Sequence, residues 1–245
     1  MRHRVFFTIF TIIGFLFGVI LFFELFDPQG LMLGQKAGAA ARRVEAEPAP
    51  QRADDPPRIV AFGDSLTAGL GVPREQTYPT LLQQRLDAAG YGYRVINAGV
   101  SGDTTAGGLR RVPWILKNLP MLVILELGAN DGLRGLSLDQ TKANLEAIIR
   151  QLREARVTVV LAGMKLPPNY GEAYTNGFEA MYADLARRYD LALIPFFLDG
   201  VAADPTLNQP DGIHPTGEGY RKIVETVFKT IEPLLSRQLR PRGSS

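Results

Sequence analysis

Residues 59–69 read IVAFGDSLTAG and join an apolar run to a glycine-bounded turn. The first four residues are apolar and of strand length, so they predict a buried β-strand. Gly63–Gly69 follow directly and predict a turn into a short helix. Ser65 lies in that turn, where its hydroxyl group faces the crevice beyond the strand and the N–H groups of a helix start lie nearby. On this segment alone, Ser65 fits a nucleophile and an ordinary helix N-cap equally well.

Further apolar runs of strand length follow along the chain, at Tyr93–Asn97, Leu122–Leu127, Val157–Met164 and Leu191–Phe196. Amphipathic stretches between them predict helices over Tyr78–Ala89, Leu138–Ala155, Phe178–Tyr189 and Thr216–Leu235, with a short turn around Thr104–Leu109. Apolar strands without polar alternation indicate a parallel sheet that is covered on both faces. The sequence therefore predicts an α/β fold with a central parallel sheet of about five strands and a site at their carboxyl ends.

A serine nucleophile needs a base, usually an imidazole, and the chain has only two histidines, His3 and His214. His3 lies at the extreme N-terminus, so His214 is the base by elimination if this is a serine–histidine enzyme. Asp211 stands three residues earlier and can accept a hydrogen bond from one ring nitrogen, leaving the other for Ser65. In isolation, an Asp-Gly pair is usually a plain turn and a lone histidine a surface group. Here all three residues would have to coincide by chance.

Two loops at expected strand ends offer hydrogen-bond donors for an oxyanion. Gly102 follows the second strand and lets a backbone N–H group approach a substrate without a side chain in the way. Asn130 follows the third strand, and its side-chain amide can donate to the same oxygen. Gly and Asn also build turns, and we expect Gly99, Gly128 and Gly132 to do only that.

Composition narrows the function classes. The chain has 245 residues, 46% of them apolar, which suffices for one well-buried domain plus extra segments. Its net charge is only +2 and no basic stripe stands out, so we expect no nucleic-acid binding. The absence of cysteine excludes disulfides, a thiolate nucleophile, an iron–sulfur centre and thiolate zinc sites.

The N-terminus has the pattern of a membrane segment. Two arginines precede Val5–Phe23, a run of uncharged residues that would span roughly 28 Å as a helix, close to the thickness of the bilayer core. The small-residue stretch Ala39–Ala41 lies well downstream, which favours an uncleaved anchor over a cleaved signal peptide. The expected organisation is a cytoplasmic basic leader at 1–4, a transmembrane signal anchor at 5–26, an Ala/Pro-rich linker at 27–57, a catalytic domain at 58–236 and a disordered tail at 237–245.

Four blocks of the sequence resemble the SGNH/GDSL hydrolase superfamily in order and spacing: GDSLTAG, the glycine of VSGDT, the asparagine of GANDG, and DGIHP. The stretches GDTTAGGLRR, ELGANDGLRGL and KLPPNYGEAY resemble its bacterial arylesterase, acyl-CoA thioesterase I and lysophospholipase branch. The resemblance implies a flavodoxin-like three-layer α/β/α sandwich. It also implies a triad of Ser65, Asp211 and His214, with an oxyanion hole made by the Ser65 N–H, the Gly102 N–H and the Asn130 side chain.

The same resemblance bears on the substrate loop and on localisation. Leu166, Pro167, Asn169 and Tyr170 resemble the family's mobile loop over the acyl chain, although a connection without substrate contact fits the sequence nearly as well. Enzymes of that branch are often soluble periplasmic proteins, whereas this leader is long enough to remain. We therefore expect a single-pass protein of the bacterial inner membrane with its catalytic domain in the periplasm; the alternative is a secreted or periplasmic protein after signal cleavage.

The expected activity is hydrolysis of carboxylic esters, and of acyl thioesters or lysophospholipids, through an acyl-Ser65 intermediate without a metal or cofactor. The expected partners are a small-molecule ester or thioester and the membrane, while the oligomeric state is left open. An acyltransferase would use the same residues and is a first alternative. A membrane-tethered binding module is the second, but it would be expected to lack one of the four blocks, and none is missing.

Overall fold

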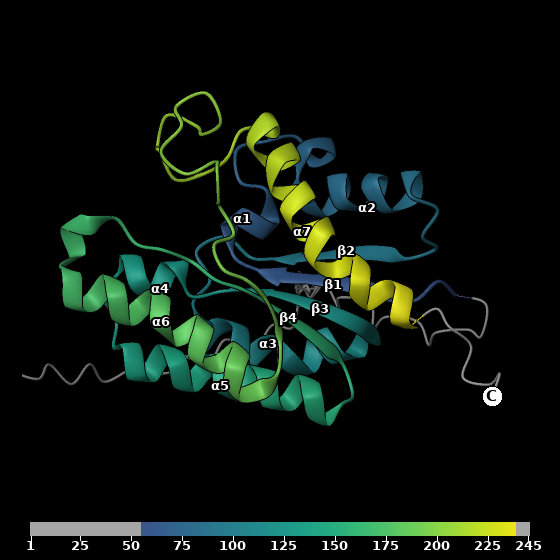
Figure 1. The fold of residues 1–245 in the computed structure, drawn as a ribbon, viewed down its shortest axis with the longest axis horizontal. Coiled ribbons are helices and arrows are strands. Elements are labelled where there is room, and N and C mark those ends of the chain that lie inside the picture. Colours follow the sequence, from purple (N-terminus) through teal and green to yellow (C-terminus); the bar gives the residue numbers. More distant parts are fainter. Residues whose placement is uncertain (1–54, 239–245) are drawn as a thin grey trace, which may run out of the picture. The chain divides into compact units, whose positions relative to one another are not determined.

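Five parallel strands lie at the centre of the residues that the computed structural model describes, 55–238 (Figure 1). They are β1 (Arg58–Gly63), β2 (Arg94–Gly99), β3 (Pro120–Glu126), β4 (Thr158–Ala162) and β5 (Ala192–Ile194). Their order in the sheet is β2-β1-β3-β4-β5, and every neighbouring pair is parallel. The predicted parallel sheet of about five strands is therefore confirmed.

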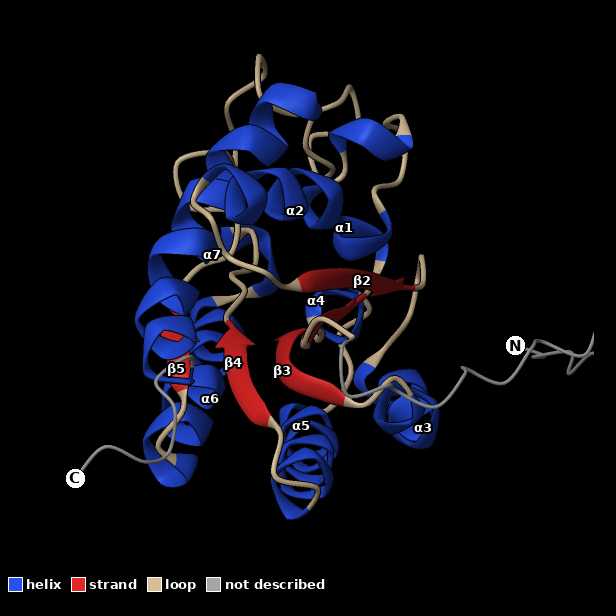
Figure 2. Ribbon diagram, turned by 90° about the vertical axis from the view of Figure 1, so that its right-hand side faces the viewer, coloured by secondary structure: helices blue, strands red, loops and turns tan. Residues whose placement is uncertain are grey.

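Helices cover both faces of this sheet. The bounds are α1 (Ser65–Ala68), α2 (Tyr78–Ala88), α3 (Thr105–Lys117), α4 (Ala129–Leu133), α5 (Leu138–Glu154), α6 (Glu172–Tyr189) and α7 (Gly217–Gln238), with 3₁₀ turns at η1 (Arg74–Gln76) and η2 (Pro168–Tyr170). Helices α2 and α7 pack together on one face, and α3, α5 and α6 cover the other. Figure 2 shows the strands between these two groups of helices.

The burial of the strands explains their apolar composition. Ile59–Phe62 of β1 and Leu122–Leu125 of β3 are fully buried, because each of these strands has a neighbour on both sides and helices above and below. The edge strand β2 has a strand on one side only. Its Arg94 and Asn97 are accordingly exposed.

The order of the strands creates a crevice. The chain leaves β1 through α1 and α2 to reach β2, and then returns through α3 to β3 on the other side of β1. Where the connections of two neighbouring strands run in opposite directions, a space is left between them at the carboxyl ends of the strands. Open α/β sheets bind their ligands in this space. The loops after β1 and β3 carry Ser65 and Asn130, so both residues lie at this point.

One expected element is wrong. The short turn predicted around Thr104–Leu109 is the beginning of α3, a helix of 13 residues. Gly107, Gly108 and Pro113 are poor helix formers, which is why the sequence pattern favoured a turn. A Cβ atom at position 108 would lie 2.2 Å from Leu127 Cδ1, so glycine allows α3 to pack closely against the end of the sheet.

Several predicted segments lie outside the described residues. These are the leader at 1–4, the transmembrane anchor at 5–26, most of the linker at 27–57 and most of the tail at 237–245; residues 237 and 238 belong to α7. Within residues 55–238, no helix is both long enough and apolar enough to cross a membrane.

Candidate active site

The turn after β1 presents Ser65 at the start of α1. Asp64 caps this helix, since its Oδ1 accepts a hydrogen bond from the Leu66 N–H at 3.0 Å. Gly69 ends the helix with φ 81°, a left-handed conformation that favours glycine. A side chain at Gly63 would collide with Thr67 Oγ1 and with the Glu126 backbone oxygen. The GDSLTAG sequence therefore suits a very tight strand-to-helix connection.

Ser65, His214 and Asp211 form a continuous chain of hydrogen bonds. Ser65 Oγ lies 2.8 Å from His214 Nε2, and His214 Nδ1 lies 2.6 Å from Asp211 Oδ2. Because a carboxylate can only accept, Nδ1 carries the proton toward Asp211 and Nε2 is left to accept from the serine hydroxyl. The structure thus brings the three residues together in the order that the sequence predicts.

Asp211 is held in its charged form. Its Oδ1 accepts hydrogen bonds from the backbone N–H groups of His214 at 3.0 Å and Ile213 at 2.9 Å. These bonds, with that from His214 foremost, and the neighbouring imidazole lower the pKa of Asp211 to about 2. The carboxylate therefore remains ionised at any pH at which the protein is expected to work.

Gln209 fastens the histidine loop to the loop that follows α1. Its backbone N–H donates to the His214 carbonyl at 2.7 Å, and its side-chain amide donates to the Leu70 carbonyl at 2.7 Å. Gly212 has φ 71°, so the turn between Asp211 and His214 requires the left-handed conformation that glycine adopts easily. These contacts hold the imidazole opposite Ser65.

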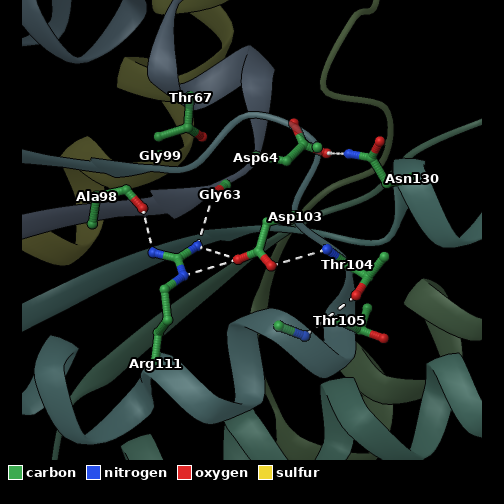
Figure 3. Close-up of polar contacts among 12 residues, drawn as sticks. Gly63, Asp64, Thr67, Ala98, Gly99, Asp103, Thr104, Thr105, Arg111 and Asn130 are labelled. Carbon is green, nitrogen blue, oxygen red and sulfur yellow. Dashed lines mark hydrogen bonds and ion pairs between the residues drawn. The ribbon is translucent and has the colours of Figure 1, made fainter. Parts of the chain in front are cut away.

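Two further donors were predicted for the oxyanion, the Asn130 side chain and the Gly102 N–H, and they lie on neighbouring loops. Asn130 belongs to α4 and donates through Nδ2 to Asp64 Oδ2 at 3.0 Å (Figure 3). A primary amide has two N–H bonds, so the second can still serve another acceptor. Gly102 lies in the turn after β2 with φ 77°, and its carbonyl accepts from Arg134 Nη2 at 3.0 Å. Arg134 follows α4 and so links the two loops directly.

A pocket of about 480 Å³ opens beside the serine, and Ser65, Asn130 and His214 all line it. Most of its other lining residues are apolar and include Leu66, Leu133, Met164, Leu166, Pro167, Phe196, Leu198 and Ile213. Among residues 55–238, no group of three or more His, Asp and Glu side chains is placed to hold a metal ion. The site thus offers an apolar binding space next to a polar reactive centre.

The predicted substrate loop contributes only part of its residues to this pocket. Leu166 and Pro167 form part of the wall. Asn169 is exposed, and the Tyr170 hydroxyl donates to the Leu133 carbonyl at 2.9 Å, which fastens the loop to α4. Neither of these two residues belongs to the described pocket lining.

A buried acid that was not predicted from the sequence lies next to the turn that carries the nucleophile. Glu126, the last residue of β3, is fully buried, and its Oε2 accepts from Thr67 Oγ1 at 2.7 Å and from the Asp64 N–H at 3.4 Å. Burial, together with the nearby Asp64 carboxyl, raises the pKa of Glu126 well above its ordinary value, and burial raises the pKa of Asp64 to about 6. The sequence does contain a sign of this buried acid, because Glu126 is the single charged residue in the apolar run Leu122–Leu127.

A model of the GDSL-like lipase/acylhydrolase family matches residues 61–222, a range that contains the serine, the asparagine and the histidine described above. The chain belongs to this family. The family description and relatives named esterase, arylesterase and thioesterase show that the chain is a carboxylic ester hydrolase of the GDSL type. The resemblance seen in the four sequence blocks is confirmed.

Individual relatives cover nearly the same region. Esterase TesA of Pseudomonas aeruginosa is 44% identical over 178 residues, which is 72% of this chain and 89% of that protein. The thioesterase 1/protease 1/lysophospholipase L1 of Escherichia coli K12 is 37% identical over 179 residues, covering 73% and 85%. The crystal structure of the psychrotrophic esterase EstA from Pseudoalteromonas sp. matches with a TM-score of 0.70 and 33% identity, over 73% of this chain and 98% of that one.

The raised pKa of Glu126 predicts a pH-dependent effect of Glu126→Gln. The folded state favours the protonated carboxyl, so its contribution to stability is complete below the ordinary pKa of 4.5 and is lost as pH rises toward the folded-state pKa. Glutamine cannot ionise. Glu126→Gln should therefore raise Tm relative to the wild type at pH 8 and leave it nearly unchanged at pH 4, as measured by calorimetry.

The exposed residue Glu75 supplies the control, because Glu75→Gln makes the same chemical change at the surface. The difference in Tm between this variant and the wild type should stay the same at pH 4 and at pH 8. If Glu126→Gln changed Tm equally at both pH values, Glu126 would titrate normally in the folded protein and the assignment would be wrong.

Proposed function

We propose that this chain is a serine esterase that hydrolyses carboxylic esters through an acyl-Ser65 intermediate. The observation that carries the proposal is the hydrogen-bond chain from Asp211 through His214 to Ser65, which ends at the wall of an apolar pocket. A nucleophile, a base and a group that orients the base are the parts that acyl transfer requires. Membership in the acylhydrolase family supports the same reading.

The first half of the proposed cycle forms the acyl-enzyme. His214 Nε2 takes the proton of the Ser65 hydroxyl while Oγ attacks the substrate carbonyl carbon, and the carbonyl electron pair moves to oxygen. The resulting oxyanion accepts hydrogen bonds from the Ser65 N–H, the Gly102 N–H and the Asn130 side chain. Ser65 lies in the first turn of α1, where backbone N–H groups have no partner within the helix.

The two products leave in turn, the alcohol or thiol as the acyl-enzyme forms and the acid in the second half of the cycle. The tetrahedral intermediate collapses to acyl-Ser65, and the leaving alcohol or thiol receives its proton from the His214 imidazolium. Water then attacks the acyl-serine with His214 as the base, and the acid is released. Asp211 stays ionised throughout, because its pKa is about 2, and so stabilises the imidazolium without taking its proton. All steps use groups of this chain and water.

The pocket supports a substrate with an acyl chain or an aryl group. Its volume of about 480 Å³ and its apolar wall would bury such a group beside the reacting carbonyl. Relatives named esterase, arylesterase and thioesterase 1/lysophospholipase L1 support esters, acyl thioesters and lysophospholipids as substrate classes for this chain. Both oxygen and sulfur esters present the carbonyl carbon that the mechanism needs.

The catalytic roles predict the effect of two substitutions in the full-length chain. Ser65→Ala and His214→Ala should each lower kcat for p-nitrophenyl esters by about a thousandfold or more, because members of a triad act as one unit. Ser137 caps the start of α5 and is not among the residues that line the pocket, so Ser137→Ala should retain the wild-type kcat. Circular dichroism checks the fold of each variant. Activity that survives Ser65→Ala would exclude Ser65 as the nucleophile.

The N-terminal sequence supports a membrane anchor at residues 5–26 that holds the catalytic domain on the periplasmic side of the inner membrane. The full-length chain, expressed in bacterial cells, should then remain in the membrane fraction after alkaline carbonate extraction. A version that begins at residue 27 should be found in the soluble fraction. Recovery of a shortened, soluble protein from cells that express the full chain would show instead that the leader is a cleaved signal peptide.

A further inference from the structure

The turn that carries Gly102 does not by itself fix the direction of its central peptide. The Asp103 N–H donates to the Val100 carbonyl at 3.1 Å, and Gly102, in the third position of this β-turn, has a positive φ of 77°. These values describe a type II turn. Types I and II share the same hydrogen bond and differ by a flip of the central peptide, which here carries the Gly102 N–H. Contacts outside the turn must therefore hold that N–H group in place.

An ion pair between Asp103 and Arg111 of α3 supplies such contacts. Asp103 Oδ2 accepts from Arg111 Nη2 at 2.6 Å and from Arg111 Nε at 2.8 Å. The other carboxylate oxygen accepts from the Thr104 N–H at 3.1 Å. Figure 3 shows Asp103 between the guanidinium group and the beginning of α3. The residue next to Gly102 is thus held from two sides.

The same guanidinium group reaches the ends of two strands. Arg111 Nη1 donates to the Ala98 carbonyl of β2 at 2.8 Å, and Nη2 donates to the Gly63 carbonyl of β1 at 3.1 Å (Figure 3). Gly63 stands two residues before Ser65 and also accepts from the Val100 N–H at 3.1 Å. One side chain therefore connects the strand end that leads to the nucleophile with the turn that carries the proposed oxyanion donor.

The ion pair is largely buried, and a glycine in α3 leaves room for the carboxylate. The side chains of Arg111 and Asp103 are 22% and 11% exposed. A Cβ atom at Gly107 would lie only 1.7 Å from Asp103 Oδ1, so α3 can pass the carboxylate only with glycine at this position. Burying two charges is costly, and the additional hydrogen bonds to backbone carbonyls offset part of that cost. A buried pair of this kind is a poor source of stability, which points to a role in geometry.

We propose that Arg111 and Asp103 are positioning residues that fix the Gly102 N–H relative to Ser65, so that the oxyanion meets a donor already in place. The inference rests on the proposed function, since it presupposes an oxyanion at this site. Both residues act through the backbone. Arginine is required because a planar guanidinium can serve a carboxylate and two carbonyls together, whereas the ammonium of lysine is a single point of charge.

The test compares Arg111→Lys and Asp103→Asn with Arg110→Lys in the full-length chain. Arg110 is the exposed neighbour on α3, so its variant makes the same chemical change away from the ion pair. Loss of a complete oxyanion-hole donor typically lowers kcat by about 10²–10³-fold, so a misplaced donor should cost about 10–100-fold. KM should stay within about threefold, because the donor acts mainly in the transition state. Arg110→Lys should match the wild type.

Should a single variant fail to fold, the double variant Arg111→Gln/Asp103→Asn keeps the test decisive, because it removes both charges and leaves none unpaired in the interior. Its kcat should fall about as far as in the single variants, since all of them remove one coupled unit. A folded double variant with wild-type kcat would overturn the proposal.

A trifluoromethyl ketone analogue of the ester provides a readout that a merely structural role would not change. Ser65 Oγ adds to the ketone carbon, His214 takes the hydroxyl proton, and the electron pair moves to oxygen, giving a stable oxyanion. The inhibition constant should rise across the variants by the same factor by which kcat/KM falls. Lower Tm with unchanged kcat and inhibition constant would show a purely structural ion pair. Retained activity in Ser65→Ala would instead overturn the proposed function itself.

Discussion

The 2.8 Å contact between Ser65 Oγ and His214 Nε2 joins residues that lie 149 positions apart, and the rest of the site is arranged around it. It requires the end of β1 and the loop before α7 to meet at one edge of the sheet. The strand order provides this edge, because β1 and β3 are neighbours whose connections leave in opposite directions. Gln209 and Asp211 then hold the imidazole in the one orientation that leaves Nε2 free to face the serine.

Buried polar groups surround this contact, in a fold whose interior is mostly apolar. Glu126 and Asp64 lie behind the nucleophile, and the Asp103–Arg111 pair lies under the Gly102 turn. Asp131 accepts from both the N–H and the hydroxyl of Thr105, which ties the loop after β3 to the beginning of α3. Each group carries a cost of burial, and each joins a loop of the site to its neighbour. Departures from a purely apolar core are thus concentrated where geometry matters for chemistry.

The sequence was sufficient for the sheet, for most of the helices and for the three residues of the hydrogen-bond chain, but not for most of the apolar pocket wall. Apolar runs reveal strands that are buried on both faces, and Asp211, His214 and Ser65 are chemically distinctive in a chain with two histidines. Helix α3 was underestimated because Gly107 and Gly108 oppose helix formation locally, while their benefit comes from tertiary contacts with Asp103 and Leu127. The partners of Arg111 could not be predicted, since Gly63, Ala98 and Asp103 meet only after β1, β2 and α3 have packed.

If Ser65 is the nucleophile, every turnover passes through an acyl group on its Oγ, and the decisive experiment is to trap that intermediate. The full-length protein is mixed with excess p-nitrophenyl ester, quenched in acid within milliseconds, and mapped by peptide mass spectrometry. We expect a burst of p-nitrophenol close to one equivalent per enzyme when deacylation is the slower step, and an added acyl mass on the peptide that contains Ser65. An acyl mass on any other residue, or full turnover without a covalent adduct at any quench time, would contradict this role of Ser65.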